Sequence, residues 1–331
     1  MVYLAALERI SAREMRTTPL IRLQEETSQV QLERATERIE RLANQGVRAI
    51  HYDDPHFPAL LREIPDPPAV LFFSGAADAL RLRCVGLVGA RRATQSGLGI
   101  AREMSAALAR RGISVVSGLA LGIDAAAHVA ALDVDGSTVA VFGCGVQRVY
   151  PAANRPLAER IRGSNGLLIS EYHPDQEPRK QFFPERNRII SGLCEAVIVI
   201  EAGEHSGSLI TARMALEQGR DVLAVPGSIL TDQSRGCHRL IREGAGLLDS
   251  IDTLFEELDL PKDLAEPMTV SCGGRRIWEV LDIDPLPLDV LATRASISLS
   301  EATLALVELE LAGFVDGSSG GYSRRAHARA L

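Results

Sequence analysis

The sequence predicts an α/β protein built on a Rossmann-like, doubly wound, mostly parallel sheet, with a small winged-helix domain toward its C-terminal end. The first reason is that short apolar runs alternate with helical stretches between about residues 84 and 225. Continuous Val/Ile/Leu runs of this kind indicate parallel strands that helices cover on both faces. The second reason is that three helical stretches and then two short strands follow residue 275, which is the order of a winged helix-turn-helix.

Six apolar runs are the expected strands of the sheet, and they lie at 84–88, 113–116, 138–142, 167–169, 196–200 and 222–225. Helical spacing of apolar residues is clear between them in 97–111 and 208–218. An acidic helix near 250–258 follows the last run. We expect the crossovers between parallel strands to be right-handed.

The flanks of this region set the expected domain boundaries. Residues 1–50 are expected to form a helical or poorly defined segment, in which 31–43 has helical spacing. Five prolines in 51–80 predict an extended connector rather than a helix. We therefore predict that the Rossmann-like domain occupies 51–260 and that a linker with two prolines and two glycines occupies 261–274.

The winged-helix domain is predicted over 275–331. Its first helix is marked by apolar residues near 277–281, its second covers 287–292, and its third covers 301–312 and is capped by Ser300. A hairpin near 313–322 forms the wing. A wing is typical of duplex DNA binding, but the third helix carries three glutamates, which disfavours a position in the major groove. The domain is therefore expected to bind protein or to be structural.

Composition excludes several classes of protein. The 331 residues hold no apolar run near the roughly 20 residues of a membrane span, and charges interrupt the N-terminal stretch where a secretory signal would lie. Five scattered cysteines without a Cys-x-x-Cys pair argue against a disulfide framework or a zinc site, and they favour a reducing, cytoplasmic compartment. The net charge of −7 argues against nucleic acid, yet basic residues concentrate in 83–111 and 179–188.

Glycine and hydroxyl residues follow almost every predicted strand, at the start of the next helix. In an open parallel sheet, ligands bind beyond the carboxyl ends of the strands. Glycine allows close backbone approach, and helix N-termini attract anions, so these loops predict a phosphate cradle. Neither a Gly-x-Gly-x-x-Gly nor a Walker A sequence is present. The candidate residues are Gly89, Arg91, Thr94, Ser117, Gly118, Leu119, Ala120, Gly143, Gly145, Ser206, Gly207 and Ser208.

The segment 182–188 interleaves aromatic with basic residues. Aromatic rings that stack bases beside arginines that hold phosphates are typical of single-stranded nucleic acid binding, so Phe183, Arg186, Asn187 and Arg188 are further candidates. The alternative is a packed phenylalanine pair with arginines that bridge loops.

Catalytic and metal-binding candidates are weaker. His128 lies four residues after Asp124, but two ligands without a third favour a hydrogen-bonded helix histidine. Cys144 lies between two glycines with no histidine nearby, which favours a small buried residue over a nucleophile. We therefore expect no catalytic residue, no metal and no cofactor.

Taken together, the loops resemble the DprA/Smf family of DNA-processing proteins. The resemblance covers about residues 52–325 in order, and its most specific motifs are 89–94 (GARRAT), 117–128 (SGLALGIDAAAH), 183–188 (FPERNR), 206–212 (SGSLITA) and 226–227 (PG). It implies an extended Rossmann domain that dimerises, binds single-stranded DNA and helps to load the RecA recombinase during natural transformation.

The same resemblance implies that the candidate loops line a DNA pocket, and one position departs from the pattern. Family members often carry a lysine after Tyr150-Pro151, whereas this chain has Ala152, flanked by Arg148 and Arg155. We expect one of these two arginines to contact DNA in its place, with Arg155 as the candidate site residue; the alternative is a lower affinity for DNA. The runner-up is a nucleotide-processing enzyme on a related Rossmann-like fold, which the same loops and Arg91 would suit. Binding across several phosphates weakens steeply with salt, so salt dependence separates the two hypotheses.

Overall fold

The computed structural model describes residues 29–260, 271–282, 285–311, 314–318 and 320–324, and it divides the chain into two compact units after Leu260. Most of the predicted linker 261–274 and the first 28 residues of the predicted N-terminal segment lie outside the described residues.

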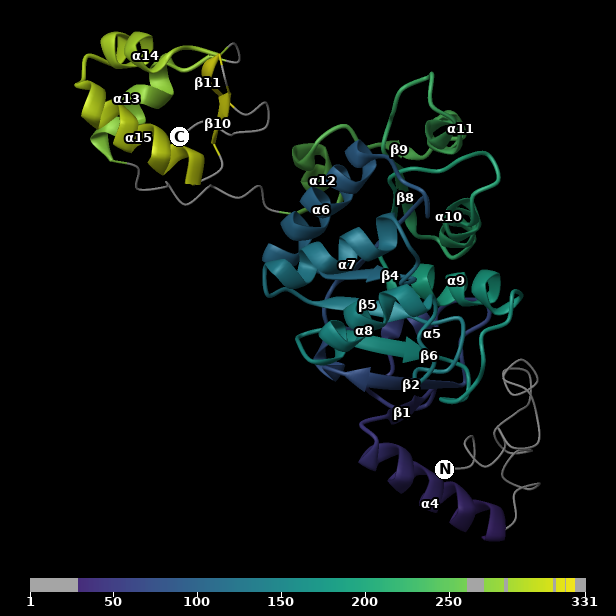
Figure 1. Cartoon of the computed structure of the whole chain (residues 1–331). Helices are drawn as coiled ribbons and strands as arrows, with labels where there is room; N and C mark the ends of the chain where they lie inside the picture. The colour runs from purple at the N-terminus through teal and green to yellow at the C-terminus, as the bar shows by residue number, and fades with distance from the viewer. Residues whose placement is uncertain (1–28, 261–270, 283–284, 312–313, 319, 325–331) are drawn as a thin grey trace. The chain divides into compact units, whose positions relative to one another are not determined.

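A nine-stranded sheet forms the centre of the described part of the first unit, in the order β1-β2-β6-β5-β4-β3-β7-β8-β9 (Figure 1). The strands from β6 across to β9 run parallel, whereas β2 is antiparallel to both β6 and β1. The strands are β1 (Arg48–His51), β2 (Val70–Gly75), β3 (Cys84–Val88), β4 (Ser114–Ser117), β5 (Thr138–Val141), β6 (Leu167–Ser170), β7 (Ala196–Val199), β8 (Asp221–Ala224) and β9 (Gly246–Leu247).

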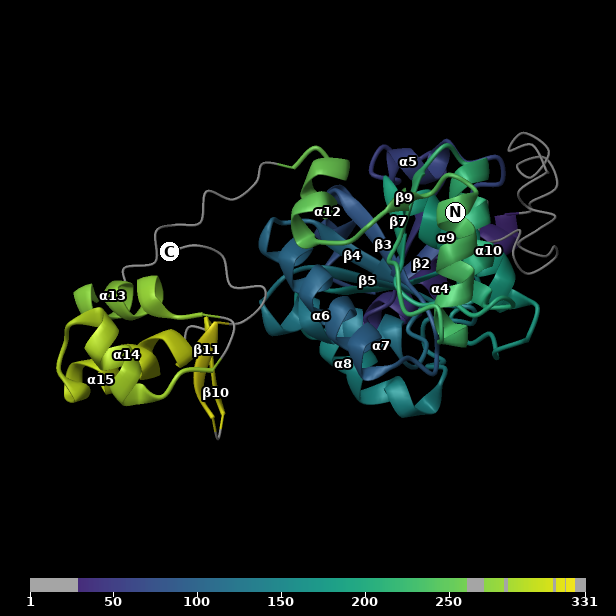
Figure 2. The ribbon, with the colours of Figure 1, turned by 90° about the horizontal axis from the view of Figure 1, so that it is seen from above.

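Helices cover both faces of this sheet (Figure 2). One face packs against α5 (Ala59–Arg62), α9 (Phe182–Leu193), α10 (Gly207–Glu217) and α11 (Arg235–Arg242). The other packs against α6 (Gln95–Arg110), α7 (Ile123–Asp133), α8 (Arg155–Arg162) and α12 (Ile251–Glu257). Both faces of the central strands are apolar and buried, which explains their continuous Val/Ile/Leu runs. The chain moves outward from β3 through β4, β5 and β6, and then from β7 through β8 to β9 on the other side, so the topological switch point lies between β3 and β7.

The doubly wound, mostly parallel sheet is confirmed, and the six predicted strands are β3 to β8 with small shifts at their ends. The helical spacing in 31–43 corresponds to α4 (Gln29–Asn44), which precedes β1. The prediction of an extended connector over 51–80 is wrong, because α5 and β2 lie in it. The prolines end at Pro68, and the apolar run from Val70 to Phe73 that follows them is a buried strand.

The second unit is a winged helix with its own core. It comprises α13 (Cys272–Val280), α14 (Leu288–Ala295), α15 (Leu299–Leu311) and a hairpin of β10 (Val315–Ser318) and β11 (Gly321–Arg324). Trp278 packs edge-on against Phe314 with ring centroids 5.5 Å apart. The predicted cap is wrong by two residues: Ser298, not Ser300, exchanges hydrogen bonds with Glu301 in a capping box.

Among the described helices, none alone is long and apolar enough to cross a membrane; a bent pair, Leu288–Ala295 with Leu299–Glu310, passes this test by length and composition only.

Candidate functional site

A cavity of about 790 Å³ lies at the carboxyl edge of the sheet, where the loops after β3 and β7 diverge. Parallel strands open a crevice at such a switch point because successive loops turn toward opposite faces. The β3 loop, the start of α9 and the start of α10 form most of its wall. Nine of the seventeen predicted site residues line it: Gly89, Arg91, Ala120, Phe183, Arg186, Asn187, Ser206, Gly207 and Ser208.

Positive charge dominates the described wall of this cavity. Arg91, Arg92 and Lys180 are exposed there, and Arg186 contributes a buried guanidinium. The carboxylate among the lining residues is that of Asp124, which is only 6% exposed. Arg92 and Lys180 were not singled out from the sequence, although both lie in the basic segments noted there. The cavity therefore suits an anionic ligand although the whole chain is acidic.

Arg186, in the wall of the cavity, links the carboxyl ends of β4 and β5. Its Nη1 donates to the carbonyl oxygen of Gly118 at 2.9 Å and also to that of Val141. Burial lowers the pKa of Arg186 to about 10, and the nearby Asp124 carboxylate opposes that shift. Burial likewise raises the pKa of Asp124, against the opposing influence of Arg186. Arg186 therefore stabilises the strand ends as well as adding charge to the cavity.

The chain's own carboxylates occupy two of the expected phosphate cradles. Asp124 accepts hydrogen bonds from the backbone N–H groups of Gly118 (3.1 Å) and Ala120 (3.3 Å). Glu201 accepts from the backbone N–H of Thr94 at 2.9 Å and from the Thr94 hydroxyl. Anions are favoured at these helix starts, as expected, but the anions belong to the protein. The N–H groups of Thr94, Gly118 and Ala120 are therefore not free to bind phosphate, contrary to what these loops led us to expect.

The start of α10 is more open to a ligand. Ser206 caps the helix by accepting from the N–H of Ser208 at 3.4 Å, and Asn187 Nδ2 donates to the carbonyl oxygen of Gly207 at 3.4 Å. A Cβ placed on Gly207 would meet no atom within 4 Å. Close approach of a phosphate to this backbone is therefore sterically possible.

The aromatic side chains at the cavity divide into two pairs. Phe183 and Tyr150 both line the cavity, with ring centroids 5.1 Å apart. Phe182 instead stacks on Tyr172, with a centroid distance of 4.1 Å. Phe183 is therefore the better base-stacking candidate of the two. Tyr150, which is 47% exposed, was not among the predicted site residues.

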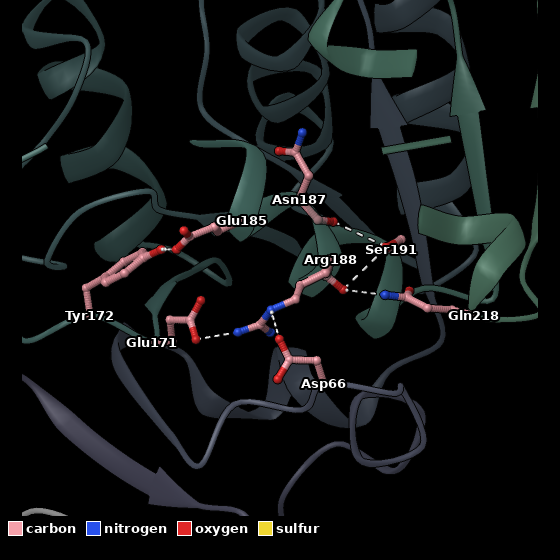
Figure 3. A network of polar contacts seen from close by, with 8 residues as sticks. All are labelled: Asp66, Glu171, Tyr172, Glu185, Asn187, Arg188, Ser191 and Gln218. Atoms are coloured by element: carbon pink, nitrogen blue, oxygen red, sulfur yellow. Dashed lines mark hydrogen bonds and ion pairs between the residues drawn. The ribbon is translucent and has the colours of Figure 1, made fainter. Parts of the chain in front are cut away.

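Arg188 lies outside the cavity lining, in a buried network on the other side of α9 (Figure 3). Its Nε lies 3.3 Å from Asp66 Oδ2, and its Nη2 pairs with Glu171 Oε2. Gln218 Nε2 donates to the Arg188 carbonyl oxygen at 3.1 Å. Residues 182–188 belong to the helix α9, and side chains two positions apart on a helix point in different directions, so Arg186 and Arg188 do not share one face. The geometry therefore does not meet the expectation that Arg188 contacts phosphate.

The other predicted residues also lie outside the cavity lining. Thr94 caps α6, and the Ser117 hydroxyl donates to the Leu87 carbonyl oxygen at 2.6 Å. Leu119 is fully buried among apolar side chains. Gly118 lies against the Arg186 guanidinium, Gly143 against Phe183, and Gly145 against the backbone of His173 and Pro174. Arg155 lines a separate cavity of about 340 Å³, together with Arg148 and Arg162.

His128 and Cys144, which the sequence predicts to be structural residues, are both buried. His128 is buried, its Nδ1 lies 2.7 Å from Thr138 Oγ1, and burial lowers its pKa to about 3. Cys144 is buried, its thiol donates to the Arg148 carbonyl oxygen at 2.7 Å, and burial raises its pKa to about 12. A thiol with a raised pKa is a poor nucleophile. Within the described ranges, no three His, Cys, Asp or Glu side chains cluster as metal ligands would.

Fold and cavity together define a Rossmann-like protein with an anion-receptive site at its switch point and an appended winged helix. A family model described as DNA recombination-mediator protein A matches residues 48–259, and one described as the DprA winged helix domain matches 266–321. The chain therefore belongs to the DprA/Smf family.

Individual relatives agree with this assignment. The chain is 47% identical over 206 residues to DNA processing protein DprA of Streptococcus pneumoniae, covering 62% of this chain and 72% of the relative. It is 38% identical over 287 residues to protein Smf of Escherichia coli, covering 83% and 77%.

Solved structures of DprA proteins have the same fold. The X-ray structure of DprA from Streptococcus pneumoniae matches with a TM-score of 0.61 and 43% identity, over 69% of this chain and 81% of that one. DprA from Helicobacter pylori, described as having a unique single-stranded DNA binding mode, matches with a TM-score of 0.58 and 28% identity, over 64% and 95%.

Proposed function

We propose that this protein is a single-stranded-DNA-binding recombination mediator of the cytoplasm, which protects incoming single strands and helps to load the RecA recombinase during natural transformation. The observation that carries the proposal is the cavity at the switch point, whose lining includes four cationic side chains and one buried carboxylate. Family membership and the binding mode described for the Helicobacter pylori relative support a single strand as the ligand.

Each part of the cavity has a role in this proposal. Arg91, Arg92 and Lys180 are exposed and supply charge to successive phosphates. The Gly207 N–H at the start of α10 contacts one phosphate directly, where the glycine leaves room. Phe183 stacks on a base that a duplex would keep inside its own stack. The Asp124 carboxylate is held by backbone N–H groups, so we assign it no catalytic role.

Fluorescence anisotropy of a labelled oligo-dT of about 20 nucleotides, titrated at several salt concentrations, tests the proposal. The logarithm of the binding constant should fall with the logarithm of salt concentration with a slope of about −0.7 per phosphate contact. Arg91→Ala should weaken binding alike for all sequences and make the slope shallower. Arg110→Ala, at the far end of α6, is the matched control and should bind like the unmodified protein. Tight capture of a mononucleotide with weak salt dependence would instead favour a nucleotide-processing enzyme.

Two partners belong to the same proposal. A homodimer would join two cavities on one strand and raise affinity through multivalency. Light scattering after size-exclusion chromatography tests the dimer. RecA loading is tested by RecA filament formation on oligo-dT coated with single-strand-binding protein, with and without this protein. An Arg91→Ala variant that still accelerates filament formation would separate RecA loading from this cavity.

A further inference from the structure

The connection from β8 to α11 carries two large apolar side chains in an unusual place. Ile229 and Leu230 are 84% and 92% exposed, the highest values among the large apolar residues whose exposure is described. The Thr231 N–H donates to the Ser228 carbonyl oxygen at 3.1 Å, which closes a four-residue turn with these two residues at its corners. Turn corners usually carry Gly, Pro, Asn, Asp or Ser, so turn geometry gives no reason for an Ile-Leu pair at this position.

The turn is held in place beside the cavity. Leu230 N–H donates to the Ser228 hydroxyl at 3.2 Å, and Gln233, two residues after the turn, belongs to the cavity wall. There, the Ala202 N–H donates to the Gln233 carbonyl oxygen at 2.7 Å. Gln233 lines the cavity, and so does Gly203, the residue after Ala202. The turn also follows the carboxyl end of β8, the edge of the sheet at which the cavity opens.

We propose that Ile229 and Leu230 form an apolar contact for nucleobases of the single strand as it leaves the cavity; this inference rests on the proposed function. The cationic wall would hold phosphates, and a strand held by its phosphates is free to turn its bases outward. An unpaired base offers an apolar face that two aliphatic side chains can cover, whereas a duplex keeps that face stacked. The turn therefore contributes to preference for single strands without adding charge.

The test compares two probes of equal phosphate number, a labelled dT 20-mer and a fully abasic 20-mer of the same backbone. Replacing both residues (Ile229→Ser with Leu230→Ser) should weaken binding to the dT probe about fivefold and leave the abasic probe unaffected. Serine suits a turn, so the fold should persist, and circular dichroism checks it. Leu82→Ser is the matched control, because Leu82 is a partly exposed leucine just before β3, at the opposite edge of the sheet.

Ile229→Trp provides a direct readout that does not depend on loss of affinity. Trp278, in the winged helix, gives the only other tryptophan signal, so a Trp278→Phe background isolates the new residue. Emission should be quenched by dT 20-mer and not by the abasic probe. Equal loss on both probes, no loss on either, or a changed oligomeric state that explains the loss would each overturn the inference. Failure of the unmodified protein to bind either probe would instead overturn the proposed function.

Discussion

The Arg188 network gives the sharpest prediction about stability. Replacing Arg188 by Met keeps most of the aliphatic stem but removes the guanidinium that pairs with Glu171 and Asp66. The Glu171 side chain is 2% exposed, whereas Asp66 is 49% exposed and can rely on water. The cost is therefore set by Glu171. Losing the partner of a buried charge typically costs about 3–5 kcal/mol.

For a unit of this size, each kcal/mol lowers the midpoint temperature by about 2–4 °C, so Arg188→Met should lower it by about 6–20 °C. Thermal unfolding followed by circular dichroism measures the change. The double variant with Glu171→Gln should recover part of the loss, because the buried carboxylate charge is then removed as well. Arg81→Met is the control: its pair with Asp78 is exposed, and such pairs contribute little.

The same variant decides the role of Arg188 in binding. Since its guanidinium lies outside the cavity lining, the folded Arg188→Met protein should bind oligo-dT with nearly the affinity of the unmodified protein. An unchanged midpoint temperature, together with weakened binding and a shallower salt slope, would refute this reasoning and place Arg188 on the strand.

Three further predictions concern pH, glycine packing and the β3 loop. His128 has a pKa lowered to about 3 by burial, against about 6.5 when unfolded, so the unfolded chain binds the extra proton and stability should fall as pH drops below about 6.5. Urea unfolding at several pH values should show this slope flattened in His128→Asn; an identical slope contradicts it. Gly145→Ala should cost about 3 kcal/mol because its Cβ would overlap backbone atoms, whereas Gly207→Ala should leave the midpoint unchanged and weaken only strand binding. Glu201→Gln should increase hydrogen exchange at Thr94, since an amide offers one acceptor where the carboxylate offers two; unchanged protection would show that the tether is dispensable.

Much of the fold was predictable because its signals are local. The strands β3 to β8 are almost entirely buried, so they appear as mostly apolar runs, and the winged helix shows helical spacing and then a hairpin. The strand β2 was also visible as a run from Val70 to Phe73, but the prolines before it led to the wrong prediction. The pairing of β2 with β1 and β6 is antiparallel and joins distant segments, which no local pattern reports.

The candidate site was predictable as a region and less so as a set of contacts. The sequence alone placed glycine, hydroxyl and basic residues at the carboxyl edge of a doubly wound sheet, and nine of the predicted residues line one cavity there. Tertiary structure decided which of these groups are free. Glu201 meets Thr94 across 107 positions, Arg186 meets Gly118 across 68, and Arg188 meets Glu171 across 17. The sequence shows which hydrogen-bond donors are present. Only the folded structure shows which distant acceptors they contact, and therefore which donors are left for a ligand.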